Sequence, residues 1–245
     1  MHIPANSELI AVWERGSGED SVGRALTVLS GCFDEPREEL VRLSIGNRDR
    51  KLLEIYERLF GPALDAFTEC PACREPLEYS LLTRDLVAAQ SQSDPSPLRI
   101  ETDGASVRLR LLDSLDLRAA TACNDLGLAG RLLMERCIIE AEVGGQPVAP
   151  EDVPEYLREP ISTALAAADP QAEMLIDLTC TACTHHWQVT LDIERFLWSR
   201  ICATAKRLLR EVHALALAYG WREPDILALS PVRRQTYLEM AWPIF

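Results

Sequence analysis

The chain contains two Cys-x-x-Cys pairs, Cys70/Cys73 and Cys180/Cys183, in distant parts of the sequence. Two thiolates three positions apart can bind one metal ion on a tight turn, and a structural zinc ion takes four such ligands in a tetrahedron. Two pairs supply all four. The sequence therefore predicts a structural zinc ion held by Cys70, Cys73, Cys180 and Cys183, which would tie two distant segments together.

The residues that follow the two cysteine pairs also match one another. At equal steps from Cys73 and Cys183, apolar residues alternate with polar ones, which is the pattern of a strand with one buried face. The matched positions are Leu77 and Trp187, Tyr79 and Val189, Leu81 and Leu191, and Leu86 and Phe196. Each segment therefore predicts a cysteine turn, a strand and then the start of a helix. Two such halves, related by approximate two-fold symmetry, would form a split zinc ribbon, with the residues between them as an insertion.

Three other interpretations compete with a structural zinc site. Two separate redox dithiols would need the βαβ context of a thioredoxin-like motif, which the surrounding pattern lacks. Two disulfide loops are disfavoured in a reducing compartment. A catalytic zinc ion would need an open ligand position. In that zinc enzyme, His185 or His186, which lie beside the second pair, could supply or replace a ligand.

The composition predicts a folded chain without a membrane span. Of its 245 residues, 47% are hydrophobic, which is enough for a packed core. The N-terminus lacks the basic and apolar regions of a signal peptide, and no apolar run approaches the roughly 20 residues that span a bilayer. We therefore expect a cytoplasmic protein, or part of a particle assembled in the cytoplasm. The four remaining cysteines lie in apolar helical patterns and are expected to be buried small hydrophobic residues: Cys32, Cys123, Cys137 and Cys202.

The charge argues against nucleic acid as a partner. The net charge is −13 and the isoelectric point is near 4.8, so phosphate backbones would repel the chain as a whole. A zinc-ribbon regulator associated with nucleic acid is still an alternative, because five arginines gather toward the C-terminus. They are Arg207, Arg210, Arg222, Arg233 and Arg234. We favour a solvated face with basic residues at helix ends, where positive charge is stabilising.

Apolar periodicity predicts a mainly helical α+β protein. The expected regions, together one compact unit, are an N-terminal helical region over 1–62, the first ribbon half over 63–87, an insertion of a hairpin and helices over 98–172, the second ribbon half over 173–193, and C-terminal helices over 194–245. A polar, proline-containing linker over 88–97 precedes the insertion.

Caps and helix breakers give several of these elements their bounds. The expected elements are a helix over 48–60 with Asn47 as its N-cap, a hairpin turned at Asp103-Gly104, and helices over 128–141, 153–168 and 193–219. Pro160 should kink or split the helix over 153–168, because proline removes a backbone donor. The helix over 193–219 has the cleanest pattern, with apolar residues at steps of three and four.

No motif in the chain predicts catalysis. A phosphate-cradling Gly-rich loop, a nucleophile elbow and a His-Glu-x-x-His motif are all absent, so we predict that the chain is not an enzyme. Its end is rich in apolar and aromatic residues and closes with Trp242-Pro243-Ile244-Phe245. We expect this segment to pack back on the domain or onto a partner protein.

Two parts of the chain resemble proteins of contractile tails. Leu43-Ser44-Ile45-Gly46, a helix, and then Thr68-Glu69-Cys70-Pro71-Ala72-Cys73 with an alternating strand resemble T4-type baseplate hub proteins of contractile phage tails and phage-like injection systems. The closing residues are similar to short tail-assembly proteins from the same gene neighbourhoods. These are Tyr219-Gly220-Trp221, Ile226-Leu227-Ala228-Leu229, Arg233-Arg234 and Tyr237-Leu238.

The resemblance implies a structural or assembly role in the baseplate of a contractile tail-like particle. The partners would be other baseplate or tail proteins, contacted through protein surfaces that include the C-terminal segment, without nucleic acid or a membrane. The zinc ion would be structural, and only the four cysteines carry over as site residues. The chain departs from the family pattern in its second complete cysteine pair and its long insertion.

Overall fold

The computed structural model describes residues 1–87, 97–102 and 104–241. Their contacts group them into two compact units. One consists of residues 1–34 together with the described residues from 194 onward, and the other is Glu35–Ile193. The helical region predicted over 1–62 is therefore divided between the two units. The linker predicted over 88–97 lies almost wholly outside the described residues.

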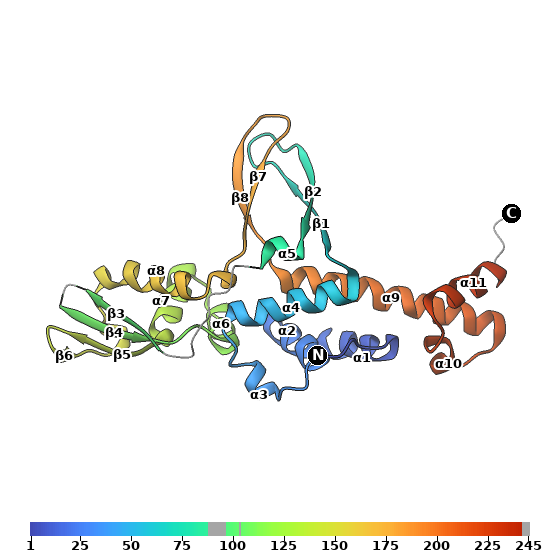
Figure 1. Cartoon of the computed structure of the whole chain (residues 1–245), viewed down its shortest axis with the longest axis horizontal. Helices are drawn as coiled ribbons and strands as arrows, with labels where there is room; N and C mark the ends of the chain where they lie inside the picture. Colours follow the sequence, from blue (N-terminus) through green and yellow to red (C-terminus); the bar gives the residue numbers. More distant parts are fainter. Residues whose placement is uncertain (88–96, 103, 242–245) are drawn as a thin grey trace. The chain divides into compact units, whose positions relative to one another are not determined.

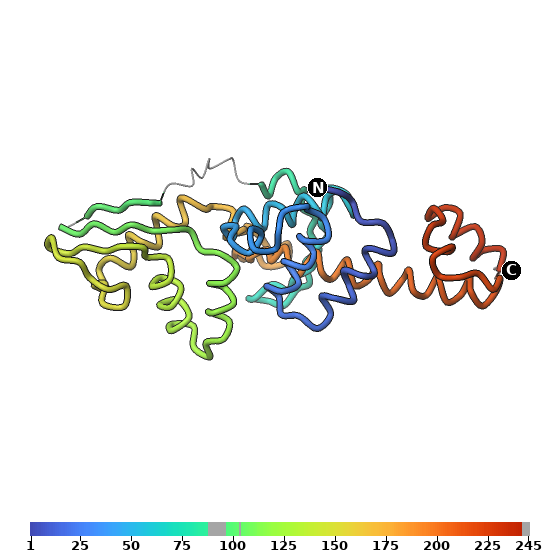
Figure 2. The backbone as a smooth tube through the Cα atoms, turned by 90° about the horizontal axis from the view of Figure 1, so that it is seen from below, coloured from blue at the N-terminus to red at the C-terminus, as the bar shows by residue number. Residues whose placement is uncertain are grey.

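The first unit is built from helices. They are α1 (Asn6–Gly16), α2 (Ser21–Ser30), α9 (Ile193–Tyr219), α10 (Glu223–Leu227) and α11 (Pro231–Ala241). Figure 2 traces α1 into α2 as a helical hairpin, and the two helices are in contact. Gly16 is required at the end of α1, because a Cβ there would lie 2.5 Å from Cη2 of Trp198. The Trp198 ring also lies beneath the guanidinium of Arg24, 5.7 Å from the ring centroid.

Helix α9 confirms the element that the sequence predicted over 193–219. Its apolar residues at steps of three and four are almost wholly buried: Leu197, Ile201, Ala205, Leu208, Val212 and Leu215. Gly220 follows with φ 67° and ends the helix in the left-handed conformation that glycine adopts without strain. Among the described residues, no helix is both long and apolar enough to cross a membrane.

In the second unit, α3 (Arg37–Leu40) is followed by α4 (Ile45–Phe60). Helix α4 begins three residues before the predicted start, and its N-cap is Ser44 instead of Asn47. The Ser44 hydroxyl accepts a hydrogen bond from the Asn47 N–H at 3.2 Å. The Gly46 N–H donates to Asp169 Oδ2 at 2.9 Å, and the Ile45 N–H donates to the carbonyl of Leu112 at 3.1 Å. Segments far along the chain thus satisfy the first turn of α4, which local capping signals could not reveal.

Two antiparallel hairpins of this unit carry the cysteine pairs. They are β1 (Ala63–Glu69) with β2 (Pro76–Leu82) and β7 (Leu175–Thr179) with β8 (His186–Thr190). Figure 1 shows them side by side with their loops at the same end. The last pairs before the loops are Glu69 with Pro76 and Thr179 with His186. Since α5 (Thr83–Leu86) follows β2 as α9 follows β8, the predicted order of cysteine turn, strand and helix occurs in both segments.

The insertion contains a four-stranded sheet in the order β3-β4-β5-β6. The strands are β3 (Leu98–Thr102), β4 (Ala105–Leu109), β5 (Ile138–Val143) and β6 (Gln146–Pro147). The predicted hairpin is confirmed by β3 and β4, although Asp103 of its turn lies outside the described residues. The helix predicted over 128–141 is wrong beyond Cys137, where the chain becomes β5. Pairing with β4 buries Ile138 and Ala141, and this tertiary contact overrides the helical pattern.

Helices and short turns complete the insertion: α6 (Ser114–Thr121), α7 (Leu126–Cys137), α8 (Arg158–Ala168), and the 3₁₀ turns η1 (Pro150–Asp152), η2 (Glu155–Leu157) and η3 (Pro170–Ala172). In Figure 1, α7 and α8 lie on one side of the sheet. The helix predicted over 153–168 is wrong in its start, since α8 begins at Arg158. Pro160 is then in the first turn, where a missing N–H costs no hydrogen bond, so the expected kink does not arise. Leu157 and Ile161 are fully buried with Val107 and Leu109.

A buried carboxylate joins this sheet to its helices. Asp116 is fully buried and accepts hydrogen bonds from both terminal nitrogens of Arg110 at 2.6 and 2.9 Å, from Arg136 Nε at 2.7 Å, and from the Asp113 N–H at 2.9 Å. Burial by itself raises the pKa of Asp116. The bonds from Arg110, the Asp113 backbone and Arg136 outweigh burial and lower the pKa to about 2.

We predict that Asp116→Asn destabilises the protein by about 2–4 kcal/mol at pH 7, because it removes the charge that two guanidinium groups share. The native pKa lies below the unfolded value of about 3.9. The stabilisation is therefore complete above that value and is lost as the pH falls toward 2. Urea unfolding at several pH values measures both effects.

The control is Glu135→Gln, which removes an exposed i,i+4 ion pair with Arg131 and should cost under about 0.5 kcal/mol. Equal stabilities of the Asp116→Asn variant and the native protein at pH 7 would contradict the assigned role of Asp116.

Candidate metal centre

The four cysteines of the two pairs meet at the ends of the two hairpins. Their sulfur atoms all lie within 4.8 Å of one another. The Sγ atoms of Cys70 and Cys183 are 3.7 Å apart, and those of Cys73 and Cys180 are 3.6 Å apart. Both of these contacts join one hairpin to the other. This four-cysteine group could hold a metal ion.

The two cysteine loops have the same backbone structure. In the first loop, the Cys70 N–H donates to the carbonyl of Glu75 at 2.9 Å, and the Arg74 N–H donates to the carbonyl of Cys70 at 2.8 Å. The second loop repeats both bonds, from Cys180 to His185 and from Thr184 to Cys180, at 2.9 and 3.0 Å. Arg74 and Thr184 are also the only non-glycine residues with positive φ in the described chain, at 63° and 58°. Each loop therefore directs its two sulfurs to the same side.

The electrostatics of the group would suit a bound cation. The backbone N–H groups of Cys183 and Ala182 lower the pKa of Cys180 to about 7. The Glu75 N–H likewise lowers the pKa of Cys73, but hydrogen bonds with the neighbouring sulfurs, together with burial, raise it to about 12. One thiolate forms readily, whereas its negative charge opposes a second nearby. Four thiolates at these distances require a positive ion between them.

The histidines beside the second pair are not part of the four-cysteine group. His186 lies on β8, where its Nδ1 is 2.8 Å from the hydroxyl of Thr179. The His185 ring stacks on Trp187, with the ring centroids 6.0 Å apart. Both residues are exposed, and the described side chains within reach of a shared ion are the four cysteines. This arrangement favours cysteine ligands over a histidine-containing site.

The other four cysteines have separate environments. Cys32 and Cys137 are buried, and burial raises the pKa of each thiol to about 11. Cys123 and Cys202 are half-buried. The prediction of buried small hydrophobic residues is therefore confirmed for Cys32 and Cys137 and too strong for the other two.

Among the five arginines near the C-terminus, Arg207, Arg222 and Arg234 lie in ion pairs. Arg234 is only 3% exposed; its Nε donates to Glu211 at 2.9 Å, and one terminal nitrogen donates to the carbonyl of Leu229 at 2.6 Å. Arg222 Nε lies 3.3 Å from an Asp225 oxygen. Arg234 is thus unavailable to a nucleic acid, and the basic surface of the regulator hypothesis loses one of its five members.

The C-terminal segment packs in part on its own unit. Ile226 and Leu227 are buried, and the Asn6 side-chain amide of α1 donates to the carbonyl of Leu227 at 3.0 Å. Tyr219, Trp221 and Tyr237 form a cluster of contacting rings with centroids 4.8–5.9 Å apart. The closing residues 242–245 of the predicted docking segment lie outside the described residues.

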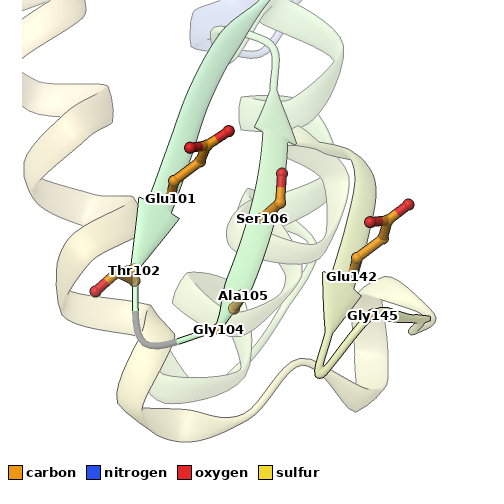
Figure 3. Close-up of a pocket in the computed structure, with 7 residues that line it drawn as sticks. All are labelled: Glu101, Thr102, Gly104, Ala105, Ser106, Glu142 and Gly145. Carbon is orange, nitrogen blue, oxygen red and sulfur yellow. The ribbon is translucent and has the colours of Figure 1, made fainter.

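A second group of polar side chains lies on the sheet of the insertion. Glu101, Ser106 and Glu142 are paired across three neighbouring strands. Their side chains point from the same face into a shallow cavity, which Figure 3 shows. Two carboxylates and one hydroxyl give no set of metal ligands comparable to the four cysteines. We interpret this row as the solvated face of the sheet, opposite the core.

Comparisons with known proteins found no relative of the chain. No family model matches the chain, and neither a curated protein nor a solved structure matches it. These comparisons link the chain to no baseplate hub protein.

Proposed function

We propose that the four-cysteine group holds one structural zinc ion and that the two hairpins form a split zinc ribbon. Zinc bound at about 2.3 Å from each sulfur of a tetrahedron sets the sulfurs about 3.8 Å apart. Two pairs that join the hairpins, at 3.6 and 3.7 Å, agree with that spacing. Thiolate ligands also suit zinc better than calcium or magnesium, which take oxygen ligands.

The ligand count favours a structural ion over a catalytic one. A catalytic zinc ion keeps one position open for water or substrate, whereas four protein sulfurs fill the tetrahedron. The nearby histidines have other contacts, with Thr179 and Trp187. We therefore propose a non-enzymatic role, in which the ion stabilises the ribbon.

Within that role, we propose that the chain is a structural or assembly component of the baseplate of a contractile tail-like particle. The single observation that carries this proposal is the four-cysteine group, since the resemblance to baseplate hub proteins includes its first pair. The second resembling segment lies on α10, α11 and the aromatic cluster around Trp221. Exposed Val232 and Met240 on α11 give this segment apolar surface for a neighbouring protein.

We predict about one zinc ion per chain in the purified protein, measured by elemental analysis. Cys180→Ser should weaken zinc binding by at least roughly 100-fold and lower the denaturant midpoint, because binding of a structural ion contributes directly to folding. Chelation of the native protein should have the same effect on the midpoint.

The matched control for this metal prediction is Cys123→Ser, which changes a half-buried cysteine outside the group. It should keep the zinc content of the native protein. A native protein without bound metal, or a Cys180→Ser variant with unchanged zinc content, would refute the zinc ribbon.

The assembly role predicts a specific defect in cells that carry the gene. Deletion should abolish complete contractile particles in negative-stain electron microscopy, and the native gene should restore them, whereas the Cys180→Ser gene should not. Transcripts of the sheath and tube genes should stay at native levels. A fall in these transcripts would favour the nucleic-acid regulator instead, and normal particles in the deletion strain would exclude the assembly role.

A further inference from the structure

A cavity of about 390 Å³ lies in the unit Glu35–Ile193, between the start of α4, the end of α8 and the loop after β4. Its volume is typical of pockets that bind small molecules. Most of its lining is apolar: Ile45, Leu111, Leu112, Leu165, Ala166, Pro170 and Ala172. The polar residues are Ser162, Asp169 and Glu173. An apolar wall with few polar groups favours a ligand that is largely hydrocarbon.

Asp169 is the polar group best placed to orient such a ligand. Its residue is only 9% exposed and lines the cavity. Its Oδ2 accepts the hydrogen bond from the Gly46 N–H. A carboxylate has roughly four acceptor positions, and the bond from Gly46 uses one of them, so the Asp169 carboxylate can accept a further hydrogen bond from a ligand.

The charges around Asp169 favour a positive ligand. The nearby guanidinium of Arg48 is bound to Asp49 at 2.7 Å, so its charge is already engaged. Burial raises the pKa of Asp49 to about 6 despite Arg48, and the charges of Asp192 and Asp169 add to that rise. These carboxylates therefore lie close enough to repel one another. Glu173 adds a further carboxylate at the cavity, so an anionic ligand would be repelled.

We propose that this cavity binds a small organic cation with an apolar body and a primary ammonium group. The ammonium donates a hydrogen bond to the Asp169 carboxylate, and the apolar body lies against Ile45, Leu112 and Leu165. The complementary charge distinguishes this ligand from a fatty acid or another apolar anion of the same size. The site is independent of the zinc proposal, because none of its lining residues belongs to the four-cysteine group.

The test uses the full chain and three probes of similar shape: 2-phenylethylammonium, 2-phenylethanol and 3-phenylpropionate. Titrations followed by NMR should show saturable binding of the ammonium, at least roughly tenfold tighter than the alcohol, because a charge-assisted hydrogen bond adds to the same apolar contact. The carboxylate should bind more weakly still. Equal affinities for the three probes, or no binding of the ammonium, would overturn the proposal.

Two variants assign the binding to this cavity. Asp169→Asn removes the charge but keeps an oxygen for the Gly46 N–H, and it should weaken ammonium binding by at least roughly tenfold. Ala166→Trp places a large side chain into the cavity from an exposed position and should abolish binding of the ammonium. This variant tests the binding site if Asp169→Asn folds poorly.

Asp177→Asn, on the exposed face of β7, is the matched control and should bind the ammonium like the native protein. Unchanged binding in both cavity variants would refute the site. Binding restricted to lysine-containing peptides would also overturn the proposal, in favour of a protein partner.

Discussion

The meeting of four sulfur atoms is the constraint on which the rest of the second unit depends. A two-stranded hairpin is barely stable alone in water, and each of these hairpins has one exposed face. Their loops bring the four thiols within 4.8 Å, where mutual repulsion prevents all of them from ionising without a cation. An ion at this point would convert two weak hairpins into one body. With the proposed zinc ion, binding of the ion and folding of the hairpins would be one equilibrium.

The insertion between the two hairpins is a folded region with its own core. The two ends of the insertion meet where the Gln171 side-chain amide donates to the carbonyl of Leu86 at 3.0 Å, and the residues between them contain this core. That core contains Val107, Leu109, Leu157 and Ile161, while Asp116 links the strand side to the helices through two arginines. This region also accepts hydrogen bonds from the first turn of α4. Asp169 accepts from the Gly46 N–H, and the carbonyl of Leu112 accepts from the Ile45 N–H. The hydrogen bonds of the insertion thus reach the helix that leads into the first hairpin.

The sequence predicted the features that depend on local spacing. The cysteine separation, the matching alternation after each pair and the apolar steps of α9 each reveal themselves within a short window. It did not predict β5, because the residues over 138–141 continue a helical pattern and only pairing with β4 makes them a strand. The first turn of α4 and the environment of Asp169 were also hidden, because Gly46 bonds to Asp169 and Ile45 bonds to Leu112, which both lie far along the chain. The meeting of the four cysteines was thus predictable, whereas the cavity was not.

The repeated loop has a consequence for the symmetry of the centre. A two-fold axis that exchanges the hairpins exchanges Cys70 with Cys180 and Cys73 with Cys183. It therefore maps the Cys70–Cys183 contact onto the Cys180–Cys73 contact, and the two distances, 3.7 and 3.6 Å, are one distance that occurs twice. Only two kinds of sulfur remain: the first of each pair is buried and the second is exposed. Solvent reaches the centre from the second cysteine of either loop, so the centre has two equivalent approaches.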